Sequence, residues 1–521
     1  MRQLKNLLGA ALLLIFAPPT FTSCGNIDNP LEEIQGSSSS KPKSSGSISY
    51  AITELLKGSK DPSFTNALTL TGDGTVSYSS SNPSVATVDA NGKVTPVAVG
   101  TTTITATISD SESYTYATKQ ASYTIELQEG YSYREWDTVD KKYVTSFAPS
   151  DNCELITSST TTLDGSKRYV VIGDVNVAHD IEITASSTII LCDNAELNIN
   201  GRLHGNQLYI HAQSEGEEMG KLNVTTDTGT DGRGVIDLST ESHFHGGKIT
   251  AIATGNTYRL YGIRGGGGIN IYGGDIKAQG NESSGYGSHG IYNNSGVIAI
   301  LGGRVEATGG NSTSNTSRAG DGICGKMTID GDAIVIATGG NGENNGGGYG
   351  LNTNSFSSKA QGRAQITAKG GNSVNGAGGI GIHLQGGLEV SDNVQITATG
   401  GDNIGTDGKG GPGSENGSLT IKDQVSITIS GGKSTGNKDG QHAIWNDLYY
   451  YGGTIIAIGG VKGPDGTSDG RAIESYRSIY NKTDESITFE YSNDGDTWGG
   501  TFDINGNSSF SPTYHGIRKT N

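Results

Sequence analysis

Three histidines stand near the same recurring Gly-Ile or Ala-Ile pair in the second half of the chain: His289, His383 and His442. Imidazole nitrogens are common zinc ligands, and a zinc site needs three or four ligands around one ion. These histidines belong to repeat units that are not neighbours, and no CxxC or Cys/His ligand spacing accompanies them. The pattern therefore predicts separate histidines and no zinc site.

Aspartates gather in the loops of the last repeat units. Calcium binds carboxylate and carbonyl oxygens, so the candidate calcium ligands are Asp407, Asp439, Asp465 and Asp469. The segment Asp494-Gly495-Asp496 lacks the rest of an EF-hand loop. Calcium is therefore the one cofactor that the sequence suggests.

The phrase apolar-x-Ala-x-Gly recurs through this half of the chain. Its glycine stands at positions 255, 280, 309, 339, 370, 400, 431 and 459, at intervals of 25 to 31 residues. A near-constant period of this size is typical of repeats that bury their apolar faces against one another. Each period holds three short β-rich segments, so we expect an all-β fold with a right-handed parallel β-helix of about 30 residues per coil.

Stacked coils place equivalent residues in columns about 4.8 Å apart. The expected inward columns are Ile276, Val305, Val335, Ile366, Ile396 and Ile427, and Ala278, Ala307, Ala337, Ala368 and Ala398, with threonines facing out. We expect the glycine to supply backbone angles that other residues avoid. The Asn or Asp that follows it is expected to form a hydrogen-bonded ladder at this corner.

The residues that directly follow the Gly-Ile pair form a column in the stacked coils, and this column shows whether two catalytic carboxylates could lie close together. It runs Arg264, Tyr292, Cys324, Asn352, His383, Trp445 and Glu474, and one unit near Pro412 lacks the pair. Hydrolysis of a glycosidic bond needs two carboxyl groups roughly 5 to 9.5 Å apart, and this column brings no two carboxylates together. We therefore expect no enzyme; the alternative is a polysaccharide lyase or glycoside hydrolase of the β-helix type.

Aromatic and amide side chains form a strip around the same pair, in a chain with few aromatics. Sugar rings lay their apolar faces on aromatic rings, and amides fix their orientation. The candidate carbohydrate-binding residues are Tyr261, Tyr286, Tyr292, Tyr349, Trp445, Tyr449, Asn293, Asn352 and Asn446. Tyrosines tolerated at a half-exposed strand position explain the strip equally well. The variable inserts after "GGN" are expected to stack along one edge beside it.

The N-terminus has the order of an export signal: Arg2 and Lys5, an apolar run, then small residues up to Cys24. Phe21-Thr22-Ser23-Cys24 resembles a lipobox, whose cysteine is acylated in the mature chain. The resemblance implies a lipoprotein signal peptide at 1–23 and a lipid anchor at Cys24 to the outer membrane or cell surface. Residues 24–46 are expected to be a flexible tether.

The net charge limits which classes of partner the chain can bind, and the cysteine spacing indicates whether disulfides form. The formal net charge is −17, and loss of the signal segment lowers it to −19, which excludes nucleic acid as a partner. Cys153, Cys192 and Cys324 remain beyond Cys24, and their spacing favours separate thiols over a Cys153–Cys192 bridge.

Short alternating strands over 47–128 predict a β-sandwich, with Asn91-Gly92 as a hairpin turn. This segment resembles the bacterial immunoglobulin-like group 2 (BIG2) domain through Ser81-Asn82-Pro83, Val85 to Val88, Gly92 and Gly100-Thr101. The resemblance implies a spacer that holds a functional head away from the cell.

The remaining chain is divided into a linker at 129–166, cap coils at 167–225, Gly-rich repeats at 226–480 and a C-terminal cap at 481–521. It resembles Gly-rich β-helix lipoproteins of gut Bacteroidetes that are described as carbohydrate-binding. The resemblance implies a non-catalytic, monomeric cell-surface lipoprotein that binds a polysaccharide or host glycan. A structural stalk or protein-binding adhesin is a further alternative.

Overall fold

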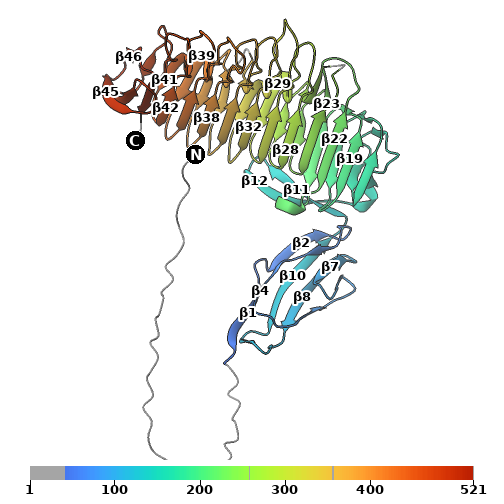
Figure 1. Cartoon of the computed structure of the whole chain (residues 1–521). Coiled ribbons are helices and arrows are strands. Elements are labelled where there is room, and N and C mark those ends of the chain that lie inside the picture. Colours follow the sequence, from blue (N-terminus) through green and yellow to red (C-terminus); the bar gives the residue numbers. More distant parts are fainter. Residues whose placement is uncertain (1–41, 257–258, 355–356, 520–521) are drawn as a thin grey trace, which may run out of the picture.

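The computed structural model describes residues 42–256, 259–354 and 357–519. The signal segment, Cys24 and most of the tether lie outside the described residues. Figure 1 shows a small β-sandwich below an elongated stack of coils. The described part of the chain contains no helix of the length and hydrophobicity that crossing a bilayer requires.

The first ten strands form the sandwich, in sheets ordered β4-β1-β9, β2-β10-β8-β5 and β3-β7-β6. They are β1 (Ser44–Tyr50), β2 (Glu54–Gly58), β3 (Phe64–Thr65), β4 (Leu68–Thr71), β5 (Val76–Ser80), β6 (Ala86–Val88), β7 (Lys93–Pro96), β8 (Gly100–Ile108), β9 (Tyr114–Tyr116) and β10 (Gln120–Gln128). The alternating residues of β8 and β10 point inward as expected, with Ile104 and Ile125 fully buried. Gly92, at φ +80°, makes the predicted turn between β6 and β7.

The segment expected to be a linker is built into the fold. Strands β11 (Tyr131–Asp137) and β12 (Lys142–Ala148) form an antiparallel hairpin. Strands β13 (Cys153–Leu155) and β14 (Thr162–Leu163) pair in parallel with the coils that follow. The hairpin packs on residues far along the chain, so local sequence did not reveal its place.

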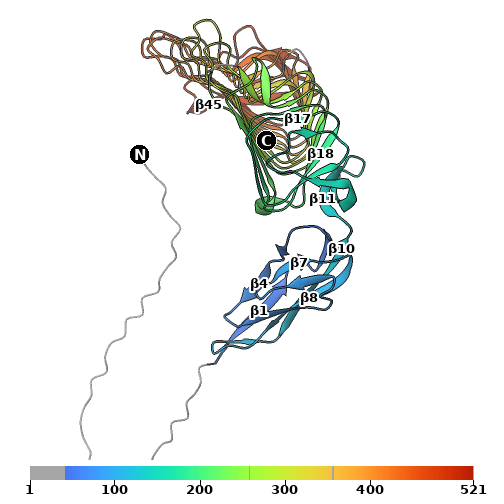
Figure 2. The same cartoon turned by 90° about the vertical axis from the view of Figure 1, so that its right-hand side faces the viewer.

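The coils share one long sheet to which each contributes one strand. Its parallel strands are β16 (Asp174–Val177), β19 (Glu196–Asn200), β22 (Lys221–Thr226), β25 (Lys248–Ala253), β28 (Asp275–Gln279), β30 (Arg304–Thr308), β32 (Ile334–Thr338), β35 (Gln365–Lys369), β38 (Gln395–Thr399), β40 (Ser426–Ser430) and β42 (Thr454–Ile458). Both predicted inward columns are confirmed, because their members pair coil to coil and are buried. The fold is thus a parallel β-helix, seen nearly end-on in Figure 2.

A second long sheet takes two segments from most coils. Its strands are β15 (Arg168–Val171), β17 (Ile181–Ile183), β18 (Ser187–Leu191), β20 (Leu203–Gly205), β21 (Leu208–Ala212), β23 (Arg233–Leu238), β24 (Ser242–Phe244), β26 (Leu260–Gly265), β27 (Ile269–Ile271), β29 (Ile291–Ile300), β31 (Ile323–Ile329), β33 (Leu351–Asn352), β34 (Ser358–Ala360), β36 (Ile382–His383), β37 (Leu388–Val390), β39 (Ser414–Ile421), β41 (Ile444–Tyr450), β43 (Ile479–Asn481) and β46 (Ser509–Phe510), after β13 and β14. The unit near Pro412 does complete the column after Gly-Ile, because Ser414 takes the place of the isoleucine and Glu415 lies between His383 and Trp445.

The last coil is covered by antiparallel strands rather than by another coil. Strand β47 (Gly516–Lys519) pairs with β42, and β44 (Ile487–Ser492) pairs with β47 and β45 (Trp498–Ile504). The cover closes the open strand edge, which would otherwise offer unpaired backbone groups to another chain.

The glycines of "ATGG" serve close packing, which corrects the reason predicted for them. Gly370 and Gly400 of the predicted column and the Gly371 and Gly401 that follow them have no positive φ; of the predicted glycines, only Gly255 has one, at +74°. A Cβ added to Gly401 would lie 1.9 Å from the carbonyl oxygen of Gly371 on the preceding coil, and one added to Gly371 would lie 1.8 Å from that of Gly340. Backbone therefore packs directly on backbone at this corner, and a methyl group has no room.

The Asn ladder at the same corner exists, but its donors are backbone groups. The N–H of Asn341 donates to Oδ1 of Asn311 at 2.8 Å, and Asn372 and Asp402 continue the pattern, each to the side chain one coil earlier. The inserts stack beside it as predicted, through parallel bridges that join Ser283, Ser312, Gly342, Ser373 and Asn403 in turn. The corner is structural.

Replacing Gly401 with alanine should lower the free energy of unfolding by about 3 kcal/mol, at the upper end of the cost of overpacking. The reason is that the facing carbonyl belongs to a hydrogen-bonded backbone that cannot move aside. Thermal and chemical unfolding followed by circular dichroism measure the effect. Gly499→Ala is the control, because nothing lies within 4 Å of its added Cβ; equal stability of the two variants would contradict the packing argument.

Candidate functional site

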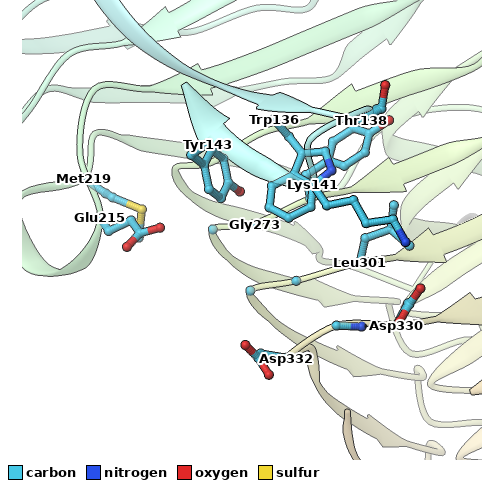
Figure 3. Close-up of a pocket in the computed structure, with 15 residues that line it drawn as sticks. Trp136, Thr138, Lys141, Tyr143, Glu215, Met219, Gly273, Leu301, Asp330 and Asp332 are labelled. Carbon is cyan, nitrogen blue, oxygen red and sulfur yellow. Dashed lines mark hydrogen bonds between the residues drawn. The ribbon is translucent and has the colours of Figure 1, made fainter. Parts of the chain in front are cut away.

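A pocket of about 630 Å³ lies between the β11–β12 hairpin and one corner of the β-helix. Trp136, Thr138, Lys141 and Tyr143 come from the hairpin, and Glu215 and Met219 from the loop before β22. The opposite wall consists of the turns that lead into β28, β30 and β32: Tyr272 to Gly274, Leu301 to Gly303, and Asp330 to Asp332. Figure 3 shows the hairpin side chains above these turns.

Buried histidines hold the hairpin in place. The N–H of Trp136 donates to Nδ1 of His245 at 3.0 Å, and Nδ1 of His211 donates to the carbonyl oxygen of Arg134 at 3.0 Å. The two imidazole rings stack with centroids 4.4 Å apart. Burial lowers the pKa of His211 to about 4 and that of His245 to about 3, so both are neutral at pH 7. The hairpin is thus a fixed wall of the pocket.

Three aromatic rings form the apolar part of the pocket. The Trp136 ring lies 6.3 Å from that of Tyr272 at an interplanar angle of 21°, and meets the Tyr143 ring edge-on at 5.2 Å. A Cβ on Gly273 would lie 2.0 Å from the Tyr143 hydroxyl oxygen, so this glycine admits the ring. Burial raises the pKa of Tyr143 to about 12, which keeps its hydroxyl protonated.

Charged groups border the aromatic rings. Asp330 accepts hydrogen bonds from Gln361 at 2.7 Å and from the N–H of Gly331 at 2.6 Å. Asp332 forms a two-fold hydrogen bond with Arg363 at 2.6 and 2.7 Å, and this contact lowers the pKa of its carboxyl group. Asp332 is therefore ionised at neutral pH and suited to accept hydrogen bonds rather than to act as a general acid.

The sequence did not point to this pocket. Trp136 and Tyr143 flank the turn of the β11–β12 hairpin, in a segment whose sequence predicted only a linker. Their neighbours Tyr272 and Asp330 lie more than a hundred residues further along the chain. Only the docking of the hairpin joins them.

The predicted aromatic strip separates into small groups. The ring centroids of Tyr261 and Tyr292 lie 4.8 Å apart, and the His289 ring stacks on both. Tyr349 stacks on His383, with the Arg318 guanidinium 3.8 Å from its ring centroid. The other three do not join these groups: Trp445 donates a hydrogen bond to the Tyr476 hydroxyl, Tyr449 stacks on Tyr480, and Tyr286 lies exposed in an insert. Tyr261 is only 4% exposed and has no free face.

The three asparagines of the strip are buried, and Asn293 also lines a small pocket of about 210 Å³. The side-chain Oδ1 of Asn293 accepts hydrogen bonds from the backbone N–H groups of Ser295 and Gly296, and these bonds close a turn. The side chain of Asn352 donates to Asp321 at 2.9 Å. Asn446 accepts the hydroxyl of Ser414 at 2.8 Å. Their amides are occupied by the fold itself.

Three of the four candidate calcium ligands hold loops in place through their carboxylates. Asp407 pairs with Lys438 at 3.3 Å. Asp439 accepts from the backbone of Thr467 and Ser468, and Asp469 from that of Lys462. Asp465 lies in the same loop, and its backbone N–H donates a hydrogen bond to the carbonyl oxygen of Gly436.

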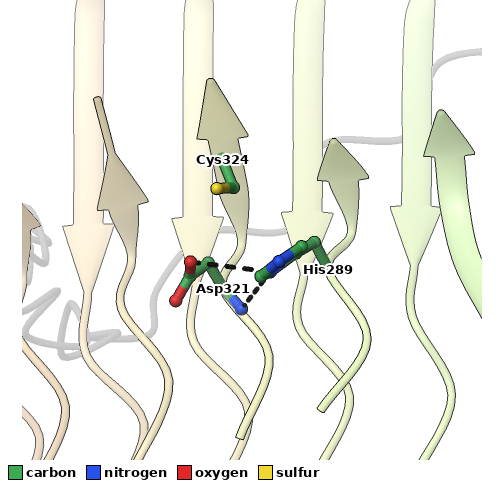
Figure 4. Close-up of side chains that lie close together, drawn as sticks. All are labelled: His289, Asp321 and Cys324. Carbon is green, nitrogen blue, oxygen red and sulfur yellow. Dashed lines mark hydrogen bonds and ion pairs between the residues drawn. The ribbon is translucent and has the colours of Figure 1, made fainter. Parts of the chain in front are cut away.

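Within the described ranges, one group of His, Cys and acidic side chains has ligand atoms within 4.8 Å of one another: His289, Asp321 and Cys324 (Figure 4). The Asp321 carboxylate already accepts hydrogen bonds from both terminal nitrogens of Arg318, from the side chain of Asn352 and from the backbone N–H of Tyr349. His289 accepts the N–H of Asp321 through Nδ1 at 2.9 Å. A cation here would meet the guanidinium charge of Arg318, so the group acts as a buried structural network.

The cysteines of the described chain are unbridged. Cys153, Cys192 and Cys324 are all free thiols, as the spacing predicted. Burial raises the pKa of Cys192 and Cys324 well above the ordinary value, so both are protonated and unreactive at neutral pH.

One carboxyl group in the predicted column has a raised pKa. Burial raises the pKa of Glu415, as a general acid would require. Its neighbours in the column are His383 and Trp445, so the adjacent coils supply no second carboxylate. Hydrolysis needs both groups; the other carboxylate of the column, Glu474, lies two coils from Glu415, beyond Trp445, and is paired with His442.

Comparison with known proteins bears on the sandwich alone. A family model described as "Intimin, immunoglobulin-like domain" matches residues 67–110, which include β4 to β8. No curated protein gives a significant match to the chain. The match covers far less than half of the 521 residues and lies within the strands that form the separate N-terminal core. The chain therefore consists of an immunoglobulin-like domain followed by a parallel β-helix.

Proposed function

We propose that this protein is a non-catalytic carbohydrate-binding lipoprotein, held at the cell surface by an acyl anchor on Cys24. The observation that carries the proposal is the pocket at the hairpin, where three aromatic rings lie beside the carboxylates of Asp330 and Asp332. Its volume of about 630 Å³ is within the range of roughly 300 to 1,000 Å³ that is common for small-ligand sites.

The chemistry of the pocket matches a sugar better than a purely apolar ligand. The C–H face of a sugar ring packs on an aromatic ring, while its hydroxyl groups donate hydrogen bonds to carboxylates. Trp136 offers the first kind of contact and Asp330 and Asp332 the second. The alternatives remain a β-helix polysaccharide lyase or hydrolase and a stalk or protein-binding adhesin.

The junction between the immunoglobulin-like domain and the β-helix suits a protein that holds its binding site at a set distance from the cell surface. Asp61 of this domain is buried and accepts hydrogen bonds from Ser132 and from Gln213 of the β-helix. Lys57 pairs with Asp193 at 3.2 Å across the same junction. These contacts tie the domain to the β-helix, which supports a spacer on an anchored chain.

Substitution of Trp136 by alanine should weaken glycan binding at least about tenfold, because the loss of a buried aromatic contact is among the costliest changes at a binding site. The chain from residue 25 onward is screened on a glycan array, and the best ligand is then titrated with both proteins. Melting temperatures check that the hairpin stays folded.

Trp445→Ala is the matched control, since it removes the tryptophan of the predicted strip. Loss of binding in Trp445→Ala alone would place the site on the strip and contradict the pocket. Release of reducing ends from a bound polysaccharide would favour the enzyme, and the absence of any glycan binding would favour the stalk or adhesin.

A further inference from the structure

Three arginines from successive coils surround one buried carboxylate on the sheet that carries the Gly-Ile column. Arg202 and Arg264 contact the two oxygens of Asp237 at 2.9 and 2.8 Å, and Arg233 lies 3.9 Å away. Arg202 precedes β20, Arg233 begins β23 and Arg264 lies in β26. The stacking of coils thus brings together cations that lie about thirty residues apart along the chain.

The cationic charge of this group exceeds its anionic charge. Asp237 has only 4% of its side chain exposed, and it also accepts the N–H of Gly234 at 3.2 Å. Asp180 is the other acid at the site. Its carboxylate accepts a hydrogen bond from the backbone N–H of Arg202 at 2.8 Å and lies 3.5 Å from Nε2 of His204. Three guanidinium groups therefore face two carboxylates, in a chain whose net charge is −17.

A pocket of about 250 Å³ opens at this group. Arg202, His204 and Arg233 line it together with the hydroxyl-bearing residues Thr230 and Ser239 and with Asp237, the carboxylate that the arginines share. Arg233 is the most accessible cation, with 51% of its side chain exposed. Guanidinium and hydroxyl donors around a small cavity are the groups that hold a sulfate or carboxylate.

Burial lowers the pKa of Arg202, and the neighbouring Arg233 and Arg264 lower it further, against the raising effect of Asp237 and Asp180. Three guanidinium groups against the two carboxylates of Asp237 and Asp180 leave one positive charge in excess at the pocket. An oxyanion entering the pocket would satisfy guanidinium donors that Asp237 does not reach.

We propose that this pocket binds the anionic substituent, sulfate or carboxylate, of an acidic polysaccharide. The adjoining residue of the next coil supports a sugar rather than a free ion. Tyr292 pairs with Arg264 in register and is half-buried, which places an aromatic ring one coil from Arg264.

The proposal does not depend on the hairpin pocket. That pocket lies at the turns leading into β28, β30 and β32, whereas the arginine pocket lies on β20 and β23. The two sites belong to different corners of the coil and have separate variants.

The test measures binding of the chain from residue 25 onward to immobilised dextran sulfate, polygalacturonate and neutral dextran. Retention of either charged polymer, with none on neutral dextran, is expected; the first polymer indicates sulfate as the anion and the second carboxylate. Arg233→Ala should weaken this binding at least about tenfold, and Arg233→Lys less, because lysine keeps the charge but loses the two-fold geometry. Arg202 and Arg264 still pair with Asp237 in both variants, so folding should be unaffected.

Lys277→Ala is the control for charge alone, because Lys277 is exposed on β28 and lines neither pocket. Equal weakening by Lys277→Ala and Arg233→Ala would overturn the proposal in favour of diffuse electrostatic attraction. Failure of the wild-type chain to retain either charged polymer would overturn it outright. Trp136→Ala should leave this binding unchanged, which separates the result from that of the hairpin pocket.

Discussion

Replacing Ala368 with arginine should unfold several coils of the β-helix. Ala368 is 1% exposed, and its neighbours in the column are Ala337 and Ala398, so a guanidinium group there would be buried without a partner. An uncompensated buried charge costs several kcal/mol, and a break in one coil removes the support of the coils on both sides. Circular dichroism and limited proteolysis measure the loss.

The adjacent residue supplies the control. Thr367 lies on the same strand with its side chain exposed, so Thr367→Arg adds the same charge to the outer face. Its melting temperature should remain within a few degrees of the wild type. If the two variants melt alike, the assignment of inward and outward positions is wrong.

Replacing Asp321 with asparagine should cost about 3 to 5 kcal/mol of stability, the usual consequence of removing one partner of a buried ion pair. Asp321 has no exposed side-chain surface and bonds both terminal nitrogens of Arg318. The variant leaves the Arg318 charge unpaired beside the neutral His289, whose pKa burial lowers to about 4. Chemical denaturation at pH 7 measures the loss.

The same pair predicts a pH dependence. Burial by itself raises the pKa of Asp321, but Arg318 and His289 outweigh burial and lower the pKa to about 2. Since the folded-state pKa lies below the ordinary value of about 3.9, this stabilisation is complete above about pH 4 and is lost as the pH falls toward 2. The stability difference between wild type and Asp321→Asn should shrink over this interval.

Asp332→Asn is the matched control for Asp321→Asn, since Asp332 also bonds an arginine through two nitrogens but is exposed. Its cost should not exceed about 1 kcal/mol. A comparable loss in both variants would contradict the buried-network interpretation. A rise in melting temperature on adding zinc, present in the wild type and absent in Asp321→Asn, would instead identify His289, Asp321 and Cys324 as a metal site.

Some local predictions from the sequence were incomplete because neighbouring coils supply what the chain itself does not show. The unit near Pro412 lacks the Gly-Ile pair, yet Ser414 and Glu415 complete the column through backbone pairing alone. Gly401 is required by the carbonyl of the preceding coil and not by its own dihedral angles. The amide of Asn352 faces the buried Asp321 instead of solvent.

The sequence by itself determined the two folds and the inward columns. Side chains alternate along a strand, and a period near 30 residues returns each position to the same place in the coil, so hydrophobic pattern and register follow from local spacing. Only the tertiary structure decided where binding sites form. The hairpin pocket unites Trp136 with Tyr272, and the arginine pocket unites Arg202 with Arg264, because docking and coil stacking place side chains together that no local pattern relates.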